Sequence, residues 1–285
     1  MKNRAIISLF FCALVSQANA GAPTPATALR TAPPQIRSDR AYIFLRMNFL
    51  KSGIASIAPV LLKIPSDDDL RSYNSAKALS FQSHQKALIS QYKKGGSKGP
   101  LPSIENYQFT YEDAQNVFGI FWNKSLEDNG EFRSFLIETY PGDYIFYGAQ
   151  TSTGIQLTSC NCLGTLKFHA ESGVITDLGT LLMARADFTS DYPELRSETG
   201  FGPALNPVFF VVSQAIRPAK SDTPLPSGLQ SSPRHMAEYH AVGPFIEPGA
   251  VVVNRFAPLP SVLGYQGGKV IDEKTGKTLE LTLTH

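Results

Sequence analysis

The chain has 285 residues, with 26 basic side chains, 24 acidic side chains and three cysteines. This near-neutral balance argues against a protein that binds nucleic acid or another polyanion, because such proteins usually carry a basic excess or stripe. A chain of this length can bury a large core without covalent staples, so the cysteine count excludes a small disulfide-rich scaffold.

The first 20 residues predict export. Lys2 and Arg4 precede the apolar run AIISLFFCALV, and SQANA ends with Ala18 and Ala20 at the positions that a signal peptidase reads. We therefore expect a signal peptide over residues 1–20, cleavage after Ala20, and a periplasmic or secreted product. Without Lys2 and Arg4 the basic and acidic counts become equal. No later run reaches the length of a transmembrane helix, so we expect no membrane span.

The next segment, residues 21–38, is rich in Pro, Ala and Thr and lacks apolar periodicity. This composition predicts a flexible lead. Residues 39–188 favour a β domain, which opens with the runs AYIFLRMNFL and IAPVLLKI. We expect these two runs to form a hairpin or a pair of adjacent strands.

A helix is predicted near residues 66–94. Ser66 can cap its first turn, the acidic residues that follow suit the positive end of the helix dipole, and Gly95 can end it. The larger apolar side chains fall on one face: Phe81, Leu88 and Tyr92. We expect an insertion packed on a sheet rather than a helix that binds a partner.

Two further strand pairs are predicted around turn residues. The stretch FRSFLIETYPGDYIFYGAQ places Pro141 and Gly142 at the centre of a type II turn. QLTSCNCLGTLKFHA and VITDLGTLLMARA form the second pair, around Gly173. Short strands at this spacing are typical of an antiparallel sandwich.

The last part of the chain, residues 189–285, is irregular and Pro-rich, with FFVVSQAI and AVVVNRF as its clear strands. It ends in KVIDEKTGKTLELTLTH, where two alternating runs flank Lys274, Thr275 and Gly276 and predict a β-hairpin. We expect this region to pack on the sandwich. The fold class is therefore mainly β, an antiparallel sandwich with a helical insertion and an irregular C-terminal β region.

Cys160 and Cys162 form the most unusual local pattern. In a regular strand their Cα atoms would lie about 6.6 to 6.8 Å apart, whereas disulfides span about 4.4 to 6.8 Å, so a bond needs a bulge or turn at Asn161. In a regular strand the pair would instead share one face with Leu166 and Phe168. Three hypotheses follow: a disulfide, two buried free thiols, or a metal or redox site.

The metal hypothesis needs further ligands. His169 and His240 are the candidates, and two thiolates with an imidazole would suit copper(I) or zinc. The segment RHMAEYH does not match either zinc peptidase spacing, so we expect a short surface helix there. The sequence shows no phosphate-binding loop, dinucleotide fingerprint or nucleophile elbow, and we expect no cofactor.

The central stretches YPGDYIFYGA, CNCLGTLKF and GVITDLGTL resemble a pattern found in uncharacterised exported envelope proteins of alphaproteobacteria. The later stretches VVSQAIRPA, EYHAVGPF and NRFAPLPSVLGYQGGKVID are similar to the C-terminal part of longer proteins of this kind. The resemblance covers most of residues 130–272. It implies an immunoglobulin-like or transthyretin-like sandwich in the bacterial cell envelope, and no catalytic residues.

Two functional hypotheses follow. The first is an exported, non-enzymatic β-sandwich protein that binds another envelope protein or a cell-surface component, or serves as its accessory subunit. The second is a periplasmic metal-binding or thiol-redox protein that uses Cys160 and Cys162. A hydrolase with an unrecognised site is a third, because sites are grafted onto folds.

Overall fold

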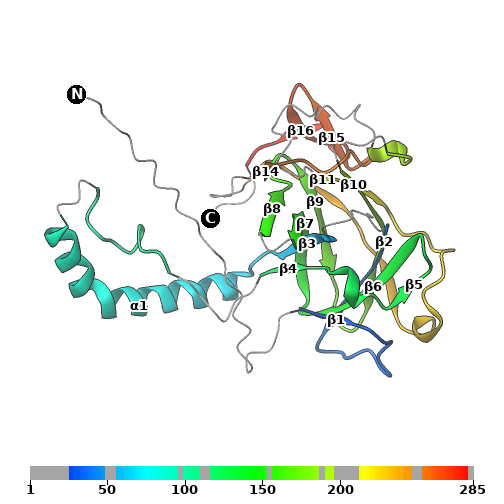
Figure 1. The fold of residues 1–285 in the computed structure, drawn as a ribbon, viewed down its shortest axis with the longest axis horizontal. Coiled ribbons are helices and arrows are strands. Elements are labelled where there is room, and N and C mark those ends of the chain that lie inside the picture. Colours follow the sequence, from blue (N-terminus) through cyan, green and yellow to red (C-terminus); the bar gives the residue numbers. More distant parts are fainter. Residues whose placement is uncertain are drawn as a thin grey trace.

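The computed structural model describes residues 26–48, 56–95, 99–109, 116–152, 156–185, 190–195, 212–245 and 252–281. Within these ranges the chain is mainly β, with two large sheets, a small third sheet and one long helix (Figure 1). The predicted signal peptide at residues 1–20 lies outside the described residues.

The first large sheet, here sheet A, combines antiparallel and parallel pairs. Its order is β1 (Ala26–Leu29), β6 (Phe132–Thr139), β2 (Ala41–Asn48), β10 (Ile175–Arg185) and β11 (Val212–Arg217). Two short strands extend it, β5 (Glu127–Asp128) beside β6 and β12 (Arg234–Met236) beside β10. We expected an antiparallel sandwich, but β10 runs parallel to both β2 and β12, so sheet A is a mixed sheet.

The second large sheet, sheet B, lies against sheet A. Its order is β13 (His240–Val242), β9 (Thr165–Ala170), β7 (Gly142–Ser152), β3 (Ser56–Lys63) and β4 (Val117–Gly119). β8 (Gln156–Cys160) pairs with β7 and, in parallel, with β14 (Val252–Val253). The described residues also include three short helical turns outside the sheets: η1 (Trp122–Lys124), η2 (Pro193–Leu195) and η4 (Ser227–Leu229).

The small sheet confirms the predicted C-terminal hairpin. β16 (Lys269–Asp272) pairs with both β15 (Leu263–Gln266) and β17 (Lys277–Leu279). Gly276 closes the β16–β17 turn with a φ of 68°, a left-handed conformation that glycine adopts at low cost. Leu263 and Val270 anchor this sheet in the main core.

The main core lies between the two large sheets. Sheet A contributes Ile43, Phe135 and Leu181, and sheet B contributes Phe146 and Phe168. The outer faces are also covered: Tyr42 and Phe44 of sheet A pack beneath Leu225 and Leu229. Burial on both faces explains why the β2 sequence AYIFLRMN is nearly continuous in apolar residues instead of alternating.

Strands that follow each other in the sequence mostly do not pair. β2 lies in sheet A and β3 in sheet B, and the same split separates β6 from β7 and β9 from β10. The predicted hairpins at these three places are therefore wrong, because the connections cross from one sheet to the other. Gly142 begins β7 with a φ of 144° at one crossing, and Gly173 has a φ of 72° at another.

The ends of the described chain are more integrated than expected. Residues 21–38 were expected to be a flexible lead, yet β1 pairs with β6 along its whole length. Residues 189–285 do more than pack on the sandwich, because β11 and β12 join sheet A while β13 and β14 join sheet B. The segment RHMAEYH forms strand β12 at its start instead of a short helix.

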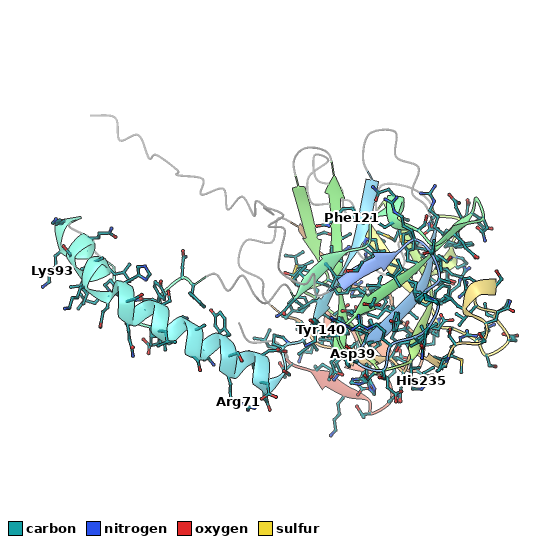
Figure 2. All side chains as sticks on the ribbon, turned by 90° about the horizontal axis from the view of Figure 1, so that it is seen from below. Asp39, Arg71, Lys93, Phe121, Tyr140 and His235 are labelled. Carbon is teal, nitrogen blue, oxygen red and sulfur yellow. A yellow bond between two sulfur atoms is a disulfide. The ribbon has the colours of Figure 1, made fainter. Side chains whose placement is uncertain are left out.

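The predicted helix is present as α1 (Asp67–Lys94). Ser66 and Asp69 form a reciprocal capping box, and Gly95 is the C-cap. The expected packing on a sheet is wrong: α1 extends away from the sheets, as Figure 1 and Figure 2 both show. Residues 99–109 run back along it, and Tyr107 packs on the buried Phe81 with ring centroids 5.5 Å apart.

Candidate functional site

The two cysteines form a disulfide at the turn that follows β8. Their Cα atoms are 5.1 Å apart, well below the separation in a straight strand, so the backbone bends at Asn161, directly before the turn at Cys162 and Leu163. The turn also changes which face the side chains occupy. Leu166 and Phe168 lie in the main core, whereas the cysteines lie in a separate cluster on the outer face of sheet B.

This turn is joined to three other segments by hydrogen bonds. The amide of Asn161 donates to the Tyr147 carbonyl at 2.7 Å. The carbonyls of Cys160 and Cys162 accept from the amides of Asn254 and Phe245, each at 2.7 Å. The turn therefore holds β7, the end of β13 and the segment after β14 together.

The side chain of Asn161 extends the network across the core. Its amide nitrogen donates to the Phe146 carbonyl at 2.8 Å and to Gln214 Oε1 at 2.7 Å. Gln214 comes from β11 of sheet A and donates in turn to the Gly148 carbonyl at 2.9 Å. Both amides are buried. A buried, mutually satisfied pair of this kind links sheet A to sheet B and favours one arrangement of the two sheets.

Burial determines what the disulfide can do chemically. Cys160 is 0% exposed and Cys162 is 3% exposed, and both pack with Tyr147, Val242 and Phe245. Thiol–disulfide exchange requires a thiolate to reach one of the sulfur atoms, and this packing covers both. The geometry therefore supports a structural cross-link more than a redox site.

The histidines expected to assist a metal site lie apart from the cysteines. His169 is on β9, exposed, with Nδ1 at 2.8 Å from Asp143 Oδ1. His240 is exposed on β13 opposite Lys167, and its nearest acidic partner is Glu238 at 4.0 Å. Within the described ranges, no group of three His, Cys, Asp or Glu side chains could hold a metal ion.

The contact between His169 and Asp143 has an electrostatic consequence. Burial alone would raise the pKa of Asp143, but hydrogen bonds from His169 and Lys167 lower that pKa overall. The Lys167 ammonium lies 3.2 Å from the second carboxylate oxygen. The three side chains form a small polar group on the surface of sheet B.

A second buried polar group was missed in the sequence. Asp177 is fully buried on β10, and its carboxylate accepts from Arg234 at 2.7 Å and lies 3.8 Å from Arg46. Arg234 also donates to the carbonyls of Thr223 and Lys220, so the group ties the 218–226 connection to sheet A. The sequence did contain a signal for this group, an aspartate inside the apolar run VITDLGTLL. A carboxylate in a buried strand needs charged or hydrogen-bonding partners, so its position predicts a buried polar group.

The most prominent surface feature is α1 together with residues 99–109, which we call the arm. Aromatic contacts join its two parts: Tyr73 packs on Phe109 and Phe81 on Tyr107, with ring centroids 5.7 and 5.5 Å apart. Ser80 and Tyr107 share a hydrogen bond of 2.8 Å between their hydroxyls. The described part of the arm therefore has its own internal contacts, while most of α1 remains exposed.

The arm joins sheet B at a narrow base. The Lys63 amide donates to the Asn116 carbonyl at 2.8 Å, and β3 pairs with β4 directly beyond. Lys63 also contacts Asp69 in the first turn of α1, at 3.1 Å. The arm is thus an insertion between two paired strands, and its removal would leave their pairing possible.

Comparisons with protein-family models, curated proteins and solved structures found no match. None of the helices in the described ranges is long and apolar enough to cross a membrane.

Proposed function

We propose that the protein is an exported, non-enzymatic protein of the bacterial cell envelope, and that it binds another envelope component through its arm. The signal-peptide pattern at residues 1–20 supports export. The observation that carries the binding role is the arm itself. A helix of 28 residues in which only Phe81 is buried contributes little to the core, so its exposed length is available for a partner.

The finer fold relationship is also a proposal. Two sheets around one core support the immunoglobulin-like or transthyretin-like sandwich that the resemblance implies. The parallel pairing of β2 with β10 departs from a purely antiparallel sandwich. The relationship is therefore supported by the layering of the sheets.

The test compares the full chain with a variant that lacks the arm. Residues 66–115 are replaced by a short turn of glycine and asparagine, which the adjacent Lys63 and Asn116 can accept. Both proteins are expressed with their first 20 residues and cross-linked in intact cells. We expect cross-linked envelope species from the full chain only, and an intact mass that shows cleavage after Ala20.

Circular dichroism and urea unfolding check that the shortened protein keeps its β structure. Equal cross-linking of the folded shortened protein and the full chain would contradict a binding role for the arm. Retention of residues 1–20 in the isolated protein would contradict export.

A further inference from the structure

The charges of the arm are unevenly distributed along α1. The first turn is acidic, with Asp67, Asp68 and Asp69, and the charged residues of the helix beyond it are all basic. Between Leu70 and Phe109 the sequence has six basic residues and one acidic residue. The whole chain has 26 basic and 24 acidic residues, so 20 basic and 23 acidic residues lie outside this stretch. The nearly neutral total therefore conceals a basic stretch that begins after the first turn of α1 and a slightly acidic remainder.

The basic residues in the second half of α1, Lys86, Lys93 and Lys94, are exposed. In the described part of the chain, no ion pair involves Lys86, Lys93 or Lys94. Leu79, Lys86 and Lys93 are spaced by seven residues and share the face turned away from Phe81. Leu79 is 69% exposed, the highest value among the exposed large hydrophobic residues. This face combines one apolar side chain with two unpaired ammonium groups.

A surface of opposite charge lies on sheet A, near η2 and the β5–β6 turn. We call it the acidic end, and it consists of Phe132, Tyr192 and the acidic residues around them: Glu127, Asp128, Glu131, Asp191 and Glu194. Arg133 pairs with Asp128, and Arg217 pairs with Glu194. Glu131 and Asp191 are exposed and have no ion pair with another described residue.

The acidic end also offers apolar surface. The rings of Phe132 and Tyr192 are half-buried, with centroids 6.5 Å apart. They pack against a small cluster that includes Leu182 and Leu195. The acidic end therefore matches the exposed face of the arm in chemistry, with carboxylates for the lysines and aromatic rings for Leu79.

The two surfaces cannot meet within one molecule. β5 lies on the side of the sheets away from α1, as Figure 1 shows. Lys93 lies near the far end of the helix (Figure 2), and α1 spans about 42 Å at 1.5 Å per residue. Charges this far apart are screened in solution, because the Debye length is about 8 Å at physiological salt.

We propose that the arm of one copy docks on the acidic end of a second copy of this chain. The inference rests on the proposed binding role of the arm and names its partner. Because the two surfaces differ, the contact is heterologous, and it generates rings or open chains of molecules instead of a closed symmetric dimer.

Two other partners fit the arm less well. A second arm is a weaker match, because two of the three carboxylates in the first turn of α1 are already paired, Asp68 with Arg71 and Asp69 with Lys63. A lipid surface requires an interfacial helix with a continuous apolar face. Leu70 and Leu79 are nine residues apart and lie on opposite sides of α1, and Tyr73 and Phe81 are engaged by residues 99–109.

Sedimentation velocity of the purified exported protein, over a range of concentrations at low and high NaCl, tests the proposal. We expect concentration-dependent species larger than dimers at low salt and their loss at high salt. Lys86→Glu with Lys93→Glu, or Glu131→Lys with Asp191→Lys, should each weaken association about tenfold or more. A chain that carries all four substitutions should recover most of the association, because the charges of the two surfaces are then exchanged and remain opposite. The matched control is Lys269→Glu with Lys277→Glu, two exposed lysines outside the arm, which should change little.

Three outcomes would overturn the proposal: a monomer under every condition, a four-substitution chain no better than the pairs, or association weakened equally by the control. Arm-dependent binding of the monomer to vesicles with phosphatidylglycerol would also overturn it, in favour of a lipid surface. If the protein is monomeric but its cross-links in cells still require the arm, this inference fails and the proposed function stands. If the protein is monomeric and its cross-links in cells do not require the arm, both this inference and the proposed function fail.

Discussion

The disulfide makes a quantitative prediction because it closes a very short loop. Cys160 and Cys162 are separated by two positions, so the loop contains three residues, for which the chain-entropy relation yields about 1.6 kcal/mol at 25 °C. A disulfide that closed a much longer loop would contribute roughly twice as much or more. We therefore expect reduction to lower the free energy of unfolding by about 1 to 2 kcal/mol. The reduced protein should remain folded at room temperature.

The hydrogen bonds of the turn explain why folding should survive reduction. The carbonyls of Cys160 and Cys162 and the amide of Asn161 keep their partners whether or not the sulfur atoms are joined. The double substitution Cys160→Ala and Cys162→Ala should cost about 1 to 3 kcal/mol more than reduction, because it also removes buried atoms from the outer-face cluster.

Urea unfolding followed by circular dichroism, with and without reductant, measures the contribution of the disulfide. The alanine variant measured with reductant is the control, since reductant should not change its stability. A protein that unfolds on reduction would refute the reasoning, and so would one whose stability does not change. Rapid alkylation of the cysteines in the reduced, folded protein would contradict their burial.

Three further predictions concern the polar groups of the sheets. Asp177→Asn should lower the free energy of unfolding by about 2 to 4 kcal/mol, because it leaves two largely buried guanidinium groups without their carboxylate; a loss below about 1 kcal/mol in urea unfolding would contradict this. Gln214→Leu should cost about 2 to 4 kcal/mol in the same assay, since Asn161 and the Gly148 carbonyl lose a buried partner, and an unchanged stability would show that the link between the sheets is dispensable. Asp143→Asn should cost less than about 1 kcal/mol at pH 7, where the carboxylate is exposed enough to be partly screened. The pKa of Asp143 is lowered in the folded state, so the stabilisation is present above the unfolded pKa of about 3.9 and is lost as the pH falls through the folded value. Wild type and variant should therefore converge in acid, and a gap that persists there would contradict the ion-pair explanation.

The local elements were largely predictable from sequence. Ser66 as the N-terminal cap and Gly95 as the C-terminal cap predicted the bounds of α1 to within a residue. The C-terminal hairpin was equally clear, because Gly276 and the alternating runs around it specify a turn. In both cases the signal comes from backbone hydrogen bonds and φ angles within a few residues.

The cysteine pair could be predicted only as a set of alternatives. Spacing alone showed that a disulfide needs a turn at Asn161, but a regular strand with two thiols satisfied the same sequence. The tertiary structure decided between them, because partners from Phe245, Asn254 and Gln214 surround the turn. These residues lie more than 50 positions away, so no local pattern could report them.

The sequence by itself determined where the longer strands and the helix form, because propensity, capping and turn chemistry act over short distances. It missed the short strands β1 and β12, which form only through pairing with β6 and β10. Only the tertiary structure decided which sheet each strand joins. β2 and β3, β6 and β7, and β9 and β10 look like hairpins in sequence, yet each pair is divided between the sheets. An apolar run that is buried on both faces has no alternation of polar and apolar residues, so its sequence does not indicate which strand lies beside it. The direction of the arm was equally hidden, because a helix that packs on residues 99–109 has the same apolar stripe as one that packs on a sheet.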